Sequence, residues 1–196
     1  MNLTNKQLYK KGKRSFVYLA TSGNKQVIIK EQRVDTDAMN VLEKEAQWLK
    51  LVNTKKIGPK FYHLTENELI MEYIDGVLFP SWVETATKKD ILIVLQDLLT
   101  QCFTLDTLGV SKEEMTNPYK HILIRNNKPI LIDFERSRKR INPQNVTQFC
   151  HYLTSSGMSK TLARKDIYFN VQKTRELTAG YKRNLKKTFF LKDILC

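Results

Sequence analysis

The sequence has no apolar run as long as the roughly 18 to 20 residues that a membrane-spanning helix needs. Its most apolar stretch, from Ile91 to Leu99, is interrupted by Gln96 and Asp97. The first residues carry charge, but no apolar segment follows them, which is unlike a secretory signal. We therefore expect no membrane partner.

Cysteine is scarce. The three cysteines, Cys102, Cys150 and Cys196, are odd in number and share no metal-type spacing. This usage favours a reduced, cytoplasmic setting. The sequence also lacks internal repeats, and its 41% hydrophobic and 27% charged residues are typical of a globular protein.

Acidic residues are few in the last third of the chain. The 196 residues include 33 Lys and Arg against 20 Asp and Glu, a formal net charge of +13. Residues 136–196 hold 14 of the basic side chains and three of the acidic ones, so the first 135 residues are nearly balanced. A positive field of this size attracts phosphates, nucleic acid or an acidic partner without choosing among them, and it can also serve solubility alone.

Residues 1–75 have the pattern of strands around one helix. Apolar positions at helical spacing predict the helix over residues 38–52. The strands are predicted from β-branched and aromatic residues between turn signals, at 14–21, 26–33, 60–64 and 68–73.

The rest of the chain has mainly helical patterns. Thr87 is placed to cap a long helix that reaches Leu105, and the chain reads as helical and basic from Asn142 onward. A hairpin between them is predicted from two short apolar strands, at 121–124 and 129–134. The order predicts an α+β protein with two lobes, residues 1–75 and 76–196.

Lys30 is the first candidate for a functional side chain. It follows three aliphatic residues on a strand that is apolar enough to be buried, and a buried ammonium needs an anionic partner or ligand. Glu43 and Glu45 on the next helix are the available acids. The alternative is an edge-strand lysine that reaches water beside a solvated acidic helix face.

Asp133 is the second candidate, because it ends the apolar segment PILID. A carboxylate at the mouth of a buried hairpin usually binds a metal or a polar ligand, since an unpaired charge is costly there. The alternatives are a cap for the following segment or a salt bridge to Arg136 or Arg138.

Two loops hold weaker candidates. His121 opens the hairpin, with Glu113 and Glu114 seven or eight residues earlier; a lone histidine is more often structural, and adjacent loop acids are usually solvated. Gly12 lies among basic residues before a strand and could cradle phosphate, but no G-x-G-x-x-G or GK[ST] pattern accompanies it.

These segments occur in one order: a glycine turn and strand, a strand lysine, a helix glutamate, MEYIDG, a polar loop before HILI, and an IDF hairpin. In that order and spacing, residues 8–155 resemble a small atypical protein kinase of the RIO-like and lipopolysaccharide-kinase-like kind, similar in outline to the KEOPS-complex kinase. The resemblance implies a minimal two-lobed protein-kinase-like fold. It also implies binding of ATP with Mg²⁺ or Mn²⁺ and transfer of the γ-phosphoryl group to a Ser or Thr hydroxyl of a protein.

The resemblance implies a role for each matched residue. Lys30 would hold the α and β phosphates and pair with Glu45, while Asp133 would bind the metal. Glu114 would accept the hydroxyl proton, and His121 stands where kinases place a second metal ligand. The residues that would contact the nucleotide lie in the glycine turn and in the hinge of residues 72–75: Gly12, Ser15, Val17, Glu72 and Tyr73.

The chain departs from the kinase pattern H-x-D-x-x-x-x-N in its catalytic loop. No aspartate lies in that loop, and the two glutamates are two or three residues too far from His121 for the usual spacing. Histidine is also a poor ligand for Mg²⁺, and Glu135 replaces the glycine of IDFG. Nucleotide binding is therefore better supported by the sequence than phosphoryl transfer.

Two other functions stay open. A kinase-fold scaffold or ATP sensor would bind ATP without transferring phosphate, as the missing aspartate suggests. An RNA- or ribonucleoprotein-associated protein would use the basic last third, and its binding would depend steeply on salt. The clusters that would serve it are 136–140 and 182–187.

Overall fold

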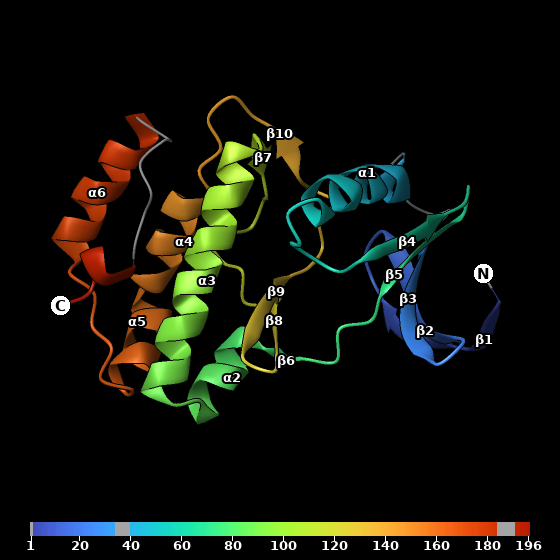
Figure 1. Cartoon of the computed structure of the whole chain (residues 1–196), viewed down its shortest axis with the longest axis horizontal. Coiled ribbons are helices and arrows are strands. Elements are labelled where there is room, and N and C mark those ends of the chain that lie inside the picture. The colour runs from blue at the N-terminus through green and yellow to red at the C-terminus, as the bar shows by residue number, and fades with distance from the viewer. Residues whose placement is uncertain (1, 34–39, 184–190) are drawn as a thin grey trace. The chain divides into compact units, whose positions relative to one another are not determined.

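A computed structural model describes residues 2–33, 40–183 and 191–196 of the chain. These residues form an α+β protein, which confirms the class predicted from the sequence. The chain divides into two compact units (Figure 1): Met1–Asp75 with Ile132–Arg136, and Gly76–Leu131 with Ser137–Cys196. The segment 132–136, which carries Asp133, thus belongs to the first unit although it follows the hairpin of the second.

The first unit contains a five-stranded antiparallel sheet in the order β1-β2-β3-β5-β4. Its strands are β1 (Leu3–Lys11), β2 (Ser15–Ser22), β3 (Lys25–Gln32), β4 (Phe61–Leu64) and β5 (Glu68–Glu72). The last four were predicted. Strand β1 was not, because its side chains are mostly polar and almost all exposed, so it lacks the apolar alternation of a half-buried strand.

Helix α1 (Val41–Asn53) packs on this sheet against β3, β4 and β5 (Figure 1). Its apolar positions, including Leu42, Ala46 and Leu49, are buried as the helical spacing predicts. The predicted first residues of this helix, 38 and 39, lie outside the described residues. Strand β3 is the middle strand of the sheet, with Lys30 opposite Val17 on one side and Leu69 on the other.

The second unit is mainly helical. Its helices are α2 (Phe79–Thr85), α3 (Lys88–Thr107), α4 (Asn145–Leu153), α5 (Ser156–Ala163), α6 (Val171–Arg183) and the short 3-10 helix η1 (Leu191–Asp193). Helix α3 lies beside α4, and α6 packs on α4 in turn (Figure 1). The Thr87 side chain accepts a hydrogen bond from the Asp90 N–H at 3.1 Å, so the predicted cap is confirmed. Helix α2 was not predicted.

Two small sheets complete the second unit. They comprise β6 (Val77–Leu78) with β8 (Ile122–Arg125) and β9 (Lys128–Leu131), and β7 (Val110–Ser111) with β10 (Arg138–Lys139). Strand β9 ends at Leu131, whereas the sequence predicted a strand through residue 134. In the part of the chain that the structure describes, no helix has the length and apolar character needed to cross a membrane.

Candidate nucleotide and metal site

Lys30 of β3 and Glu45 of α1 form a buried ion pair. The Lys30 ammonium donates to both carboxylate oxygens of Glu45, at 2.8 and 2.7 Å. The Lys30 side chain is 12% exposed and that of Glu45 is 1% exposed. This geometry brings together the two residues that the sequence offered as partners and places Lys30 in the interior rather than at an edge. Glu43, the other acid considered, is exposed.

Asp133 joins this pair from the segment 132–136 of the same unit. Its Oδ1 atom accepts a hydrogen bond from the Lys30 ammonium at 3.3 Å, and its side chain is 38% exposed. The Asp133 backbone has φ 64°, in the left-handed region that is strained for residues with a Cβ atom. Such strain is concentrated at functional sites, because the surrounding structure must hold it in place.

Three carboxylates meet beside Lys30. One oxygen from each of Glu45, Asp133 and Glu135 lies within 4.8 Å of the other two. Carboxylate oxygens are the hard ligands that Mg²⁺ and Mn²⁺ prefer, so the donor chemistry fits the expected cation. Glu135 was identified in the sequence as a departure from glycine, but its place in this cluster was not predicted.

The pKa directions follow from burial and charge. Burial alone lowers the pKa of Lys30, but the attraction of Glu45 and then of Asp133 outweighs it and raises the pKa above the ordinary value. Burial also raises the pKa of Glu45, and the ammonium of Lys30 opposes this effect. The ammonium therefore stays charged, and it is what keeps a carboxylate tolerable at this depth.

The predicted glycine turn is a closely packed structure between β1 and β2. The Gly12 N–H donates to the Ser15 carbonyl at 2.9 Å, and a Cβ atom on Gly12 would lie 2.8 Å from that oxygen. A side chain at position 12 would therefore displace the turn. Ser15, the first residue of β2, is buried, and Val17 lies opposite Lys30 in the sheet.

The predicted hinge, residues 72–75, begins at the last residue of β5, and part of it is engaged within the first unit. The Glu72 N–H donates to the Lys60 carbonyl at 2.8 Å, so this backbone donor is already used within the sheet edge. The Glu72 carboxylate accepts from the Lys60 N–H at 3.1 Å. Tyr73 packs edge-on against Tyr9, with ring centroids 6.1 Å apart, and burial raises its pKa.

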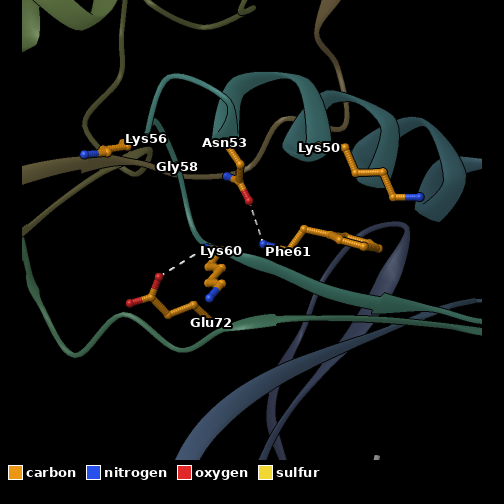
Figure 2. A pocket seen from close by; sticks show the side chains of 7 residues that line it. All are labelled: Lys50, Asn53, Lys56, Gly58, Lys60, Phe61 and Glu72. Atoms are coloured by element: carbon orange, nitrogen blue, oxygen red, sulfur yellow. Dashed lines mark hydrogen bonds between the residues drawn. The ribbon is translucent and has the colours of Figure 1, made fainter.

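A pocket of ≈ 490 Å³ lies on the first unit beside the end of α1 (Figure 2). Its lining combines one aromatic ring with several basic side chains: Lys50, Asn53, Lys56, Gly58, Lys60, Phe61 and Glu72. The Asn53 side-chain amide holds the segment between α1 and β4 in place. It donates hydrogen bonds to the Ile57 and Pro59 carbonyls and accepts one from the Phe61 N–H. Of the predicted site residues, Glu72 lines this pocket; Lys30, Glu45 and Asp133 do not.

Glu114 and His121 belong to the second unit and pair with each other. His121 Nε2 lies 2.8 Å from Glu114 Oε2, and Glu114 has φ 76°. Its neighbour Glu113 is bound by Arg138 at 2.7 Å. The interaction of Arg138 considered from the sequence was with Asp133, whereas the structure places its Nε on Glu113.

Two side chains of the basic cluster 136–140 form contacts within the second unit. Arg138 binds Glu113, and the Lys139 ammonium donates to the Leu108 carbonyl at 2.9 Å. Lys182 is exposed on α6. Most of the cluster 182–187 lies outside the described residues.

A buried polar network in the second unit was not predicted from the sequence. Asp106 of α3 accepts hydrogen bonds from the backbone and side chain of Asn145 at 2.8 and 2.6 Å, and from the Tyr181 hydroxyl at 2.8 Å. Asn145 Oδ1 also accepts from the Lys112 N–H at 2.9 Å. This network joins α3, α4 and α6 to the start of the loop that carries Glu114.

Comparison with known proteins adds one relative. No protein-family model matches the chain. The chain is similar to "Uncharacterized protein MJ1211" of Methanocaldococcus jannaschii, with 29% identity over 116 residues, which is 58% of this chain and 99% of that protein.

Proposed function

We propose that the protein is an atypical, protein-kinase-like phosphotransferase that binds ATP with Mg²⁺ or Mn²⁺ and phosphorylates a Ser or Thr hydroxyl of a protein. The observation that carries the proposal is the convergence of Lys30, Glu45 and Asp133. A buried ammonium flanked by carboxylates, one of them strained and part-exposed, suits a polyphosphate bound together with a divalent cation. A two-lobed kinase-like architecture and a cytoplasmic location are part of the same proposal.

Each residue of the cluster has a distinct task in this proposal. Lys30 is held by Glu45 so that its ammonium is fixed and charged before the phosphates bind, which avoids reorganisation during the reaction. Asp133 would hold the cation, which would neutralise the charge that develops on phosphoryl transfer. Glu114 is the candidate acceptor for the hydroxyl proton, and its contact with His121 orients its carboxylate.

The test has two readouts, ATP affinity and transfer of labelled phosphate to the protein itself or to a protein substrate. Lys30→Ala and Asp133→Asn are expected to weaken ATP binding, and Glu114→Gln is expected to leave binding intact while removing transfer. ATP binding without transfer by the wild type would favour a scaffold or ATP sensor instead. Unchanged ATP binding in Lys30→Ala would refute the proposal.

An RNA or ribonucleoprotein contact is a separate proposal, and the net charge of +13 supports it. Several of the 14 basic residues in the last third already form contacts within the fold. We therefore expect RNA binding to neutralise fewer than 14 phosphates, and its salt dependence to be correspondingly less steep.

A further inference from the structure

Arg14 links the glycine turn to the segment that carries Asp133. Its Nη1 atom donates to Glu135 Oε1 at 2.8 Å, across 121 positions of sequence. The Arg14 side chain is 36% exposed and that of Glu135 is 15% exposed. The contact places a guanidinium next to the three carboxylates that surround Lys30.

Hydrogen bonds hold the backbone at Arg14, whereas its side chain is partly exposed. The Arg14 carbonyl accepts from the Arg33 N–H at 2.9 Å, and the Arg33 side chain donates to the Gly12 carbonyl at 3.1 Å. The long Arg14 side chain can therefore change partners without moving the turn. Its planar fork of donors suits a phosphate as well as a carboxylate.

The Arg14 side chain remains partly accessible to solvent within its ion pair with Glu135. Pairs that are partly exposed to water contribute little, because solvent screens them and ordering two side chains costs entropy. A phosphate carries more charge than a carboxylate and offers three acceptor oxygens. A phosphate near the glycine turn would therefore compete successfully for the guanidinium.

We propose that Arg14 is a further phosphate-binding residue for the nucleotide and that Glu135 competes with the phosphates for it. This inference rests on the proposed ATP site. Glu135, at the position where the resembled kinases have glycine, thereby sets how tightly the protein holds the nucleotide phosphates. It also explains why a charged residue is tolerated beside Asp133 and Glu45: Arg14 compensates it.

The experiment measures affinities of ATP and of adenosine by calorimetry, first with Mg²⁺ and then in EDTA, where no cation on Glu135 contributes. The variants are Arg14→Gln, Glu135→Gln and the double variant. Lys13→Gln is the matched control, since Lys13 is exposed and its replacement removes one positive charge from the same turn. Thermal unfolding of each variant checks that the fold is retained.

Arg14→Gln is expected to weaken ATP binding about tenfold, the scale of one charge-assisted hydrogen bond, and to leave adenosine binding unchanged. In EDTA, Glu135→Gln is expected to tighten ATP binding by up to about fivefold, and the double variant is expected to lose this gain. Lys13→Gln should change ATP affinity by less than Arg14→Gln.

Three outcomes would overturn the inference. The first is an equal loss of ATP affinity in Lys13→Gln and Arg14→Gln, and the second is a gain of ATP affinity in Glu135→Gln that persists in the double variant. The third is the absence of measurable ATP binding in EDTA for both the wild type and Glu135→Gln. Failure of the wild type to bind either ATP or adenosine with Mg²⁺ would instead refute the proposed function itself. The two failures are therefore separable.

Discussion

Lys30 Nζ lies 2.7 Å from Glu45 Oε2, in a setting where the glutamate side chain is 1% exposed. Moving both charges out of water is costly, and their attraction repays that cost only when the geometry is good. Replacement by apolar side chains would often be as stable or more so. The pair is thus weak evidence for added stability, and the proposed function explains it by a phosphate ligand of the ammonium.

Replacing one partner of the Lys30–Glu45 pair should lower the free energy of unfolding more than replacing both. Lys30→Met leaves Glu45 buried without its cation, and we expect a loss of about 3 kcal/mol in the free energy of unfolding. Lys30→Met/Glu45→Leu should recover most of that loss. Urea denaturation measures both, with Glu43→Gln as the exposed control that changes little. Equal destabilisation by the single and double substitutions would contradict the buried-pair description.

The same variant should acquire a pH dependence of stability. Burial raises the pKa of Glu45, and Lys30→Met removes the opposing ammonium, so the folded-state pKa lies above the unfolded value of about 4.5. The folded protein then binds more protons than the unfolded chain, and stability falls as pH rises from about 4.5 through the folded-state pKa. Denaturation of Lys30→Met at several pH values should show this fall. The fall of stability with pH should be absent in Lys30→Met/Glu45→Gln. If the double variant still shows this fall, Glu45 is not the titrating group that causes it.

The buried network of the second unit should contribute to its stability. Tyr181→Phe removes the hydroxyl that donates to Asp106 at 2.8 Å, and we expect a cost of about 1–3 kcal/mol, because the carboxylate stays buried with one donor fewer. Tyr168→Phe is the control, since Tyr168 is 54% exposed. Chemical denaturation distinguishes the two. Equal, negligible effects would show that the hydroxyl contributes nothing to the network.

The cap of α3 offers a local test of the helix boundary. Thr87→Ala removes the side-chain acceptor of the Asp90 N–H and should cost about 1 kcal/mol of stability. Thr85→Ala, two residues earlier and outside the cap, should cost clearly less. If both substitutions cost the same, Thr87 would not act as the helix cap.

The sequence predicted the parts of the site that stand on regular elements. Lys30 and Glu45 were accessible to prediction because an aliphatic strand and an apolar helical spacing fix where their side chains must lie. The contact between Arg14 and Glu135 was not, since it joins a turn to a loop across 121 positions and neither has a periodic pattern. The same holds for the Asp106 network, whose members lie in three separate helices and in the loop after β7.

The ion pairs of Glu113 and Glu114 also show why sequence spacing could not distinguish these two residues. Glu113 and Glu114 are adjacent and chemically equal in the sequence, yet Arg138 binds the first and His121 the second. Only the folded loop, with Glu114 at φ 76°, separates their side chains. Strained backbone of this kind depends on tertiary contacts and leaves no local signal in the sequence.

Calorimetry of ATP binding with Mg²⁺ and with EDTA, in the wild type, Lys30→Ala and Asp133→Asn, tests whether Lys30 and Asp133 act on the same bound nucleotide. If the ammonium and the carboxylate act on one bound nucleotide, the wild type binds ATP more tightly with Mg²⁺. Lys30→Ala then loses tenfold or more under both conditions, on the scale of lost charge-assisted contacts, and Asp133→Asn loses the benefit of Mg²⁺. Wild type and both variants with the same affinity, or a wild type that does not bind ATP, would contradict it.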